Sequence, residues 1–228
     1  MDTKRNFPAG LVGKKLGMTQ VFTPDGKAVP VTAIQVGPCY VLQVKTNEKD
    51  GYSAVQLGFD PKKPQRVNRP ETGHFSKAAK GAFYHVKELR CDVDSLGWSE
   101  LGKELGATDV FSEGIFVDVS GLTIGRGFAG VFKKFHVKGQ PMTRGTHEER
   151  RNIGSIGCRK SPGRTFKNKK MPGQFGVDNV TIQNLKVIAV RPEENVILVK
   201  GGIPGAKGAY VMVRKAQKKK DKSEKLAA

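Results

Sequence analysis

The sequence predicts a mainly β protein with a small α+β insertion and a long basic loop. Short segments in which apolar and polar residues alternate occur near both ends of the chain. Between them lies a region with mixed helix and strand patterns, followed by a 52-residue stretch, 125–176, that contains no leucine. Repeated short strands of this kind are typical of a barrel or a sandwich.

The first sixty residues are expected to form strands. A short strand candidate covers 16–22, and segments in which apolar and polar residues alternate cover 28–36, 40–45 and 52–59. The sequence Thr23-Pro24-Asp25-Gly26 is a strong turn signal between the first two, because proline and glycine favour the backbone angles of tight turns. The prolines of segment 60–73 indicate an extended linker.

The region after this linker is expected to be a small α+β insertion that ends near Phe111. Its expected elements are a short helix in 75–82, a strand in 83–89, a brief amphipathic turn in 98–105 and a return strand in 115–119. Trp98 lies in this near-neutral region and is expected to be a core or interface residue rather than a stacking platform.

Strands rich in β-branched residues are expected again near the end of the chain, in 180–190, 196–200 and 210–214. A barrel closed by N- and C-terminal strands would avoid exposed sheet edges. The predicted division is therefore a barrel from 1–60 and 177–215, an insertion with its return strand in 61–124, a basic extension in 125–176 and a basic flexible tail in 216–228.

The positive charge is concentrated in two segments. The formal net charge is +19, and the extension contributes +11 of it, from thirteen basic and two acidic residues. Segment 214–228 contributes +5. Local basicity indicates a polyanionic partner, and the glycines and five phenylalanines between the cations favour a segment that lies along nucleic acid. With so few branched apolar residues, the extension is expected to be mobile alone and ordered on RNA.

Motifs for catalysis, cofactors and metals are weak. Gly125-Arg126-Gly127-Phe128-Ala129-Gly130 matches a dinucleotide motif in form, but the residues after it are expected to make a poor helix, and no acidic residue on a strand end follows. His147-Glu148-Glu149 has no partner that completes a triad. Cys158 is expected to be a small packed residue, and no histidine or cysteine pair has metal-ligand spacing. We therefore expect no enzyme, cofactor or metal.

The remaining composition favours a cytoplasmic protein. No apolar run approaches the ~18 residues of a membrane span. The first residues lack the apolar stretch of a secretory signal, and three widely spaced cysteines suit a reducing compartment.

Several motifs, in order, resemble the bacterial ribosomal protein L-three family of the large subunit. They are Gly10-Leu11-Val12-Gly13-Lys14-Lys15-Leu16-Gly17-Met18-Thr19, Asp118-Val119-Ser120-Gly121 with the glycine motif after it, Gly154-Ser155-Ile156-Gly157, Lys169-Lys170-Met171-Pro172-Gly173-Gln174, and Val199-Lys200-Gly201-Gly202-Ile203-Pro204-Gly205. The chain differs from the family pattern at Arg144, Arg150 and Ile153, and at Cys158, where some relatives have a methylated glutamine.

The resemblance implies a translation-factor-like β-barrel whose extension penetrates 23S rRNA toward the peptidyl transferase centre. It also implies a role in early subunit assembly, the neighbours L-fourteen and L-nineteen, and no catalysis, membrane or small-molecule substrate. The side chains expected to bind rRNA are Arg126, Lys133, Lys134, Lys138, Arg144, His147, Arg150, Arg151, Arg159, Lys160, Arg164, Lys167, Lys169, Lys170 and Gln174.

Two alternatives stay open at this point. A free-standing RNA chaperone or nucleic-acid-compacting protein would have the same distribution of charge. The second alternative is an enzyme that binds a nucleotide at the glycine motif.

Overall fold

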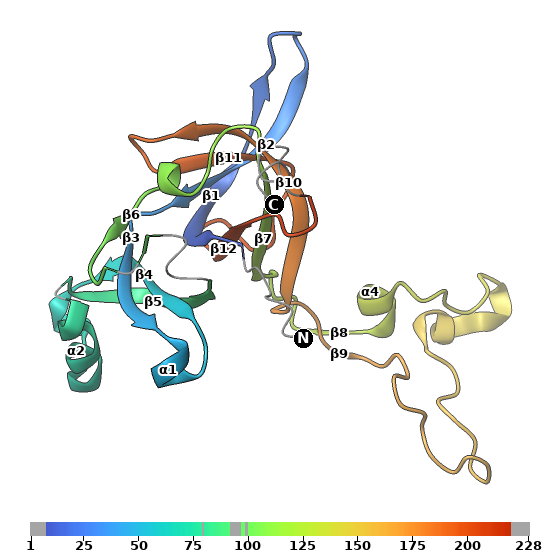
Figure 1. Cartoon of the computed structure of the whole chain (residues 1–228). Helices are drawn as coiled ribbons and strands as arrows, with labels where there is room; N and C mark the ends of the chain where they lie inside the picture. The colour runs from blue at the N-terminus through green and yellow to red at the C-terminus, as the bar shows by residue number, and fades with distance from the viewer. Residues whose placement is uncertain (1–7, 79, 92–96, 99, 220–228) are drawn as a thin grey trace, which may run out of the picture. The chain divides into compact units, whose positions relative to one another are not determined.

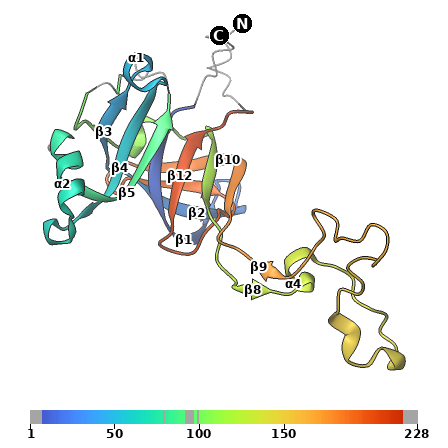
Figure 2. The same cartoon turned by 90° about the horizontal axis from the view of Figure 1, so that it is seen from below.

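The computed structural model describes residues 8–78, 80–91, 97–98 and 100–219 (Figures 1 and 2). The chain divides into two compact units. Unit 1 is Met1–Leu122 with Asn179–Ala228, and unit 2 is Thr123–Asp178. Most of the regular structure is strand, so the prediction of a mainly β chain is confirmed.

Six strands of unit 1 form a closed barrel. Their order around it is β1 (Gly10–Phe22), β12 (Tyr210–Lys215), β7 (Phe116–Leu122), β10 (Asn179–Arg191), β11 (Val196–Lys200) and β2 (Ala28–Val36). Every neighbouring pair is antiparallel. The first and last strands of the chain pair along Gly10–Lys14, so residues from both ends complete the same barrel.

The barrel interior is filled by aliphatic side chains. Leu11, Ile34, Val117, Ile197 and Val213 are fully buried in one continuous cluster. They come from five different strands, so burying their apolar surface requires all five to be paired.

A second, four-stranded sheet carries the insertion. Its order is β5 (Ala82–Arg90), β4 (Ala54–Lys62), β3 (Cys39–Lys45) and β6 (Glu104–Leu105). Helix α2 (Arg69–Phe75) packs on it through Phe75, whose ring lies 6.0 Å from that of Phe83 between centroids. The short helix α1 (Asn47–Asp50) and the 3₁₀ turns η1 (Pro64–Arg66), η2 (Ser76–Ala78) and η3 (Ala107–Asp109) complete the connections.

The expected boundary of the barrel at residue 60 differs from the structure. Strands β3 and β4 belong to the insertion sheet, and β7 takes a place in the barrel. The alternation of these segments shows that one face is buried, but it does not specify which strands pair with them.

The expected linker in 60–73 and helix in 75–82 are corrected as well. Strand β4 continues to Lys62, and the helix is α2, with Pro70 in its first turn, where a missing N–H costs nothing. The backbone N–H of Asn68 donates to the Glu71 carboxylate at 3.2 Å and caps the helix start. Pro70, one of the prolines that indicate a linker in the sequence, thus initiates a helix.

The other expected strands appear: 28–36 and 196–200 have the expected bounds, and the rest are extended or shifted by one to six residues. Trp98 is buried in the main cluster, as predicted. Parts of the predicted turn region (99), of the N-terminal segment (1–7) and of the tail (220–228) lie outside the described residues. The start of the tail is attached to the barrel: Ala216 is buried, and its N–H donates to the Phe116 carbonyl at 2.9 Å. Within the described part of the chain, no helix has the length and apolar character needed to cross a membrane.

Candidate nucleic-acid interface

Unit 2 begins and ends in a short two-stranded neck. Strand β8 (Phe128–Ala129) pairs with β9 (Gly173–Gln174), and Phe128 lies opposite Gln174. Outside these strands the Arg126 N–H donates to the Phe175 carbonyl at 2.8 Å, and the Phe175 N–H donates to the Gly127 carbonyl at 2.9 Å. The outgoing and returning chains are thus hydrogen-bonded to each other.

Glycine allows the two neck segments to approach closely. A Cβ on Gly176 would occupy the space of the Ile124 carbonyl oxygen, and the φ of Gly176 is +80°. A Cβ on Gly125 would lie 2.9 Å from a methyl group of Val177. The glycines at both ends of the extension therefore have a backbone role.

A five-residue helix, α4 (Val131–Phe135), follows the glycine motif. It ends where His136 adopts a left-handed conformation, with φ +51°. A helix forms here where the sequence indicated a poor one, but it has hardly more than one turn. This is shorter than the helix that follows the glycines of a dinucleotide fold.

The middle of unit 2 is a loop closed by contacts between its two sides. The Gln140 N–H donates to the Arg150 carbonyl at 3.2 Å, and a Cβ on Gly139 would collide with that carbonyl and with the Phe132 ring. Between them, Arg144–Arg151 forms 3₁₀ turns (η4) interrupted at His147, where φ is +44° and ψ −129°. The Thr146 hydroxyl donates a 2.6 Å hydrogen bond to the Pro141 carbonyl and fixes the turn that leads into η4.

Unit 2 has almost no interior. Its buried residues are Ala129, Val131 and Gly176, and none of them belongs to a hydrophobic cluster of the described chain. The half-buried Val137 and Ile153 line a shallow pocket with Val131, next to Lys169 and Lys170. The backbone path of unit 2 therefore depends on turns and local hydrogen bonds rather than on a packed core.

The cations of unit 2 have no acidic partners in the structure. The four ion pairs found among the described residues all lie in unit 1. The two acidic residues of the extension, Glu148 and Glu149, are exposed and make no ion pair there. The extension therefore carries a positive charge that its own side chains leave uncompensated.

Three phenylalanine rings of unit 2 are covered by cations. The Arg151 guanidinium carbon lies 4.9 Å from the centroid of the Phe132 ring, and that of Arg126 lies 5.5 Å from the Phe175 ring. The ammonium groups of Lys134 and Lys170 lie 5.2 and 5.9 Å from the Phe135 ring. Each contact holds a cation beside an aromatic face and orients it.

The comparisons with known proteins identify the family. The family model for ribosomal protein L3 matches residues 93–196. The large ribosomal subunit protein uL3 of Anaeromyxobacter dehalogenans is 48% identical over 214 residues, which is 92% of this chain and 91% of the relative. The protein of the same name from Brachyspira pilosicoli is 48% identical over 94% of this chain and 97% of its own length.

The chain belongs to the ribosomal protein L3 family. Its motifs therefore resemble this family because of common descent, and the chain is a ribosomal protein of the large subunit, a component of a ribonucleoprotein in translation. A ribosomal protein of this family works in the cytoplasm, in the ribosome.

The structure places most of the predicted contact residues of this L3 family member on the surface of unit 2. All are exposed except Lys134, which is half-buried beside the Phe135 ring. They are spread along the whole extension, from Arg126 in the neck to Gln174 in β9, and do not gather at one point. Such a spread suits an extended polyanion better than a compact ligand.

One expectation within the L3 extension is wrong. Cys158 is exposed, not packed. Because segment 154–165 has no interior to pack into, a small apolar side chain there has no burial available.

The sequence analysis missed two features of this L3 chain. The sequence treats the five phenylalanines of the extension as one set, and it does not separate Phe128 and Phe166, which are 79% and 61% exposed, from the other three. Segment 61–90 also holds eight basic and two acidic residues. This local excess of positive charge disappears when the charge is summed over all residues outside the extension and the tail. Counting charge in short windows would have found this second basic segment.

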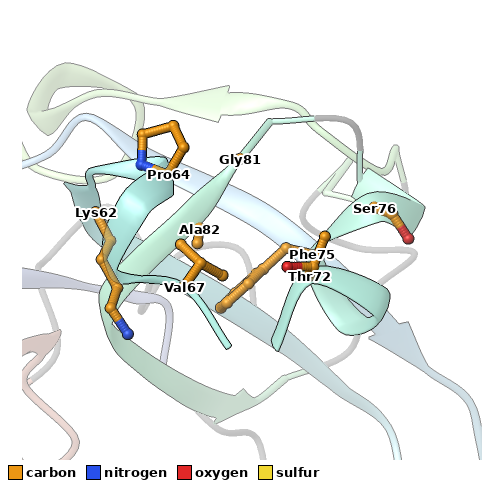
Figure 3. A pocket seen from close by; sticks show the side chains of 8 residues that line it. All are labelled: Lys62, Pro64, Val67, Thr72, Phe75, Ser76, Gly81 and Ala82. Carbon is orange, nitrogen blue, oxygen red and sulfur yellow. The ribbon is translucent and has the colours of Figure 1, made fainter. Parts of the chain in front are cut away.

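A pocket lies within this second basic segment, between α2, η1 and β5 (Figure 3). Figure 3 shows Phe75 and Val67 on its wall and Lys62 at its edge. The Lys62 ammonium is paired with Glu71 at 2.8 Å, so it is not free to compensate an anion. Among the described residues no group of three His, Cys, Asp or Glu side chains is placed to hold a metal ion.

Proposed function

We propose that the chain is a structural constituent of the large ribosomal subunit that binds 23S rRNA through unit 2. In this proposal the extension, 125–176, reaches toward the peptidyl transferase centre, and the protein aids early subunit assembly beside L-fourteen and L-nineteen without catalysing a reaction. The observation that supports it most directly is a chain segment with thirteen cations, no ion pair and no core.

The mechanism is charge neutralisation. Folded rRNA brings phosphates close together, and their mutual repulsion opposes compaction. Exposed cations such as Arg150, Arg159 and Lys167 would meet these phosphates and release condensed counterions. Since the same side chains have no acidic partner in the free protein, binding would not first have to break an ion pair.

The lack of a core also serves this function. A globular domain needs buried apolar residues and is therefore wide, whereas unit 2 is built from turns, one five-residue helix and two short strands. A thin segment could enter spaces between RNA helices that exclude a packed domain. RNA would then supply the order that the segment lacks alone.

Unit 1 would anchor the extension. Leu122 at the end of β7 pairs with Asn179 at the start of β10, so both ends of unit 2 connect to adjacent barrel strands. Fixing both ends of a loop reduces the entropy that it loses on binding. The translation-factor-like character of this barrel is part of the proposal.

Co-sedimentation tests the ribosomal role. The full-length protein, added during reconstitution of large subunits, should stay in the particle after a wash in about 1 M salt, where electrostatic contacts of exposed charges are screened. Its loss in the wash, with retention of intact subunits, would favour a free-standing RNA chaperone. Equilibrium dialysis with dinucleotides tests the enzyme alternative, for which we expect no binding.

A variant with glutamine at Arg144, Arg150 and Arg151 should assemble poorly while its barrel unfolds at the same urea concentration as the original protein. All three side chains are exposed, so their replacement removes charge and, apart from the contact of Arg151 with the Phe132 ring, little packing. Unfolding of the whole protein by these changes would show instead that the segment is part of a core.

A further inference from the structure

The five phenylalanines of unit 2 fall into two classes. Phe132, Phe135 and Phe175 are half-buried, and each has a cation within 6 Å of its ring centroid. Phe128 and Phe166 are exposed and have no aromatic or cationic partner among the described residues. The first three rings have structural partners in the extension, and the other two do not.

Folding of the extension does not explain Phe128. It lies in β8 opposite Gln174, and its ring is 79% exposed, whereas the next residue, Ala129, is buried. Side chains of successive strand residues point to opposite faces. Phe128 is therefore on the exposed face of the neck. A polar residue at this position could make the same backbone hydrogen bonds.

Folding does not explain Phe166 either. Phe166 is 61% exposed, and its only hydrogen bond found among the described residues is a long one between backbone groups, 3.4 Å from the Lys169 N–H to its carbonyl. Any residue could accept this bond. The ring leaves apolar surface in water with no compensating burial.

Cations flank both rings. Arg126 stands two residues before Phe128, and Phe166 stands between Arg164 and Lys167, all of them exposed. The cations would bring a phosphate backbone to these positions, and the bases of that backbone would then lie within reach of the rings. An aromatic face beside cations is the arrangement used to bind unpaired nucleotides.

We propose that Phe128 and Phe166 each stack on an unpaired base of the large-subunit rRNA. This inference rests on the proposed function and deepens it, because it names the kind of RNA that the extension contacts. Paired bases are already stacked inside a helix, so the two rings would select loops, bulges or junctions. Since every base has a π face, the selection depends on RNA structure more than on sequence.

The charge of the extension favours RNA over a protein as the occupant of these rings. An apolar protein surface next to Phe128 or Phe166 would have to accommodate a segment of net charge +11. Such a surface would need many acidic groups as well as an apolar patch. RNA supplies the negative charge and the flat apolar face together.

The test compares binding of full-length variants to a 23S rRNA transcript over a series of salt concentrations. Replacement of Phe128 and Phe166 together by alanine should weaken binding by at least tenfold at every salt concentration, with an unchanged salt dependence, because stacking releases no counterions. Tyrosine at both positions keeps the aromatic face and should restore affinity to within about twofold. Phe22, which is 65% exposed in unit 1, gives a matched control: Phe22→Ala should bind as the original protein does.

The outcomes separate the inference from the proposed function. If the original protein binds with a steep salt dependence and the double alanine variant binds equally well, the stacking inference is wrong and the proposed function stands. A loss that tyrosine does not restore would also overturn stacking. If the original protein shows no salt-dependent binding at all, the proposed function itself fails.

Discussion

The Tyr210 hydroxyl donates a 2.6 Å hydrogen bond to Oδ2 of Asp60 and thereby connects barrel strand β12 to strand β4 of the insertion sheet. Lys14 of β1 lies 3.6 Å from the same carboxylate, and the imidazole of His85 stacks on the Tyr210 ring at 4.8 Å between centroids. Side chains from both sheets of unit 1 therefore meet around one tyrosine.

Removal of this hydroxyl should weaken unit 1. Tyr210→Phe leaves the Asp60 carboxylate without its donor, and we expect a loss of about 1–2 kcal/mol in the free energy of unfolding. Urea unfolding measures it. Tyr84→Phe is the control, since Tyr84 is largely exposed and its hydroxyl accepts a bond from Arg66, so it should cost less. Equal losses would show that Tyr210 has no special role.

The same contact predicts a loss of stability at high pH. The hydrogen bond to Asp60, with burial and the negative charge of that carboxylate, raises the pKa of Tyr210 to about 12. The unfolded chain releases this proton near pH 10, before the folded chain does. The contribution of Tyr210 is therefore complete below pH 10 and disappears between about pH 10 and 12. Unfolding midpoints in this range should fall less for Tyr210→Phe than for the original protein.

His85 predicts a second loss of stability, at low pH. Burial, with the positive charge of Lys87, lowers the pKa of His85 below its ordinary value of about 6.5. The unfolded chain then binds the proton at a higher pH than the folded chain, so stability falls as pH decreases below about 6.5. His85→Phe keeps a ring on Tyr210 and should make the urea midpoints at pH 7.5 and 5.5 more similar. An unchanged difference would exclude His85 as the cause.

Much of this fold could be predicted from the sequence. Alternation and runs of β-branched residues located nearly every strand of the barrel, because both patterns are typical of strands. It did not show that β3 and β4 leave the barrel, since pairing depends on residues far away, such as Leu105 opposite Cys39. Pro70 was misread because proline both ends helices and begins them, and only the capping contact of Asn68 with Glu71 separates the two cases.

The candidate site was predicted from composition, and its geometry was not. Thirteen cations and ten glycines within 125–176 indicate a segment without a core, whatever path it takes. The cation that covers Phe132 comes from Arg151, nineteen positions away, which no local pattern reveals. No such cation covers Phe128 or Phe166. Only the structure distinguishes these two rings from the other three.

Lys15 should stabilise the glycine-rich loop 201–208. Its ammonium donates to the carbonyls of Ile203 at 2.9 Å and Gly205 at 2.8 Å. Lys15→Met removes both bonds and should lower the free energy of unfolding by about 1–3 kcal/mol. The neighbouring Lys14→Met loses a partly exposed ion pair with Asp60 and a contact of its ammonium with the Tyr210 ring, 5.7 Å from the centroid, and should cost less than Lys15→Met. A larger loss for Lys14→Met than for Lys15→Met in urea would contradict this assignment.

Gly176→Ala should loosen the neck of unit 2. A Cβ there would collide with the Ile124 carbonyl, and φ is +80°. The amide protons of Arg126 and Phe175, which are hydrogen-bonded across the neck, should then exchange about tenfold faster or more with solvent. Gly145→Ala has open space around its Cβ and should leave both exchange rates unchanged. Unchanged rates in Gly176→Ala would show that the neck tolerates a side chain.

The salt dependence of binding to 23S rRNA tests the role of unit 2 most directly. If about half of its thirteen cations neutralise phosphates, the logarithm of the affinity should fall with the logarithm of salt concentration at a slope of roughly −5. Glutamine at Arg150, Arg151, Arg159 and Lys160 should make the slope shallower by up to about 3, the value if all four contact phosphates, while the barrel stays folded. A slope near zero for the original protein, or the same slope for both proteins, would contradict RNA binding by this segment.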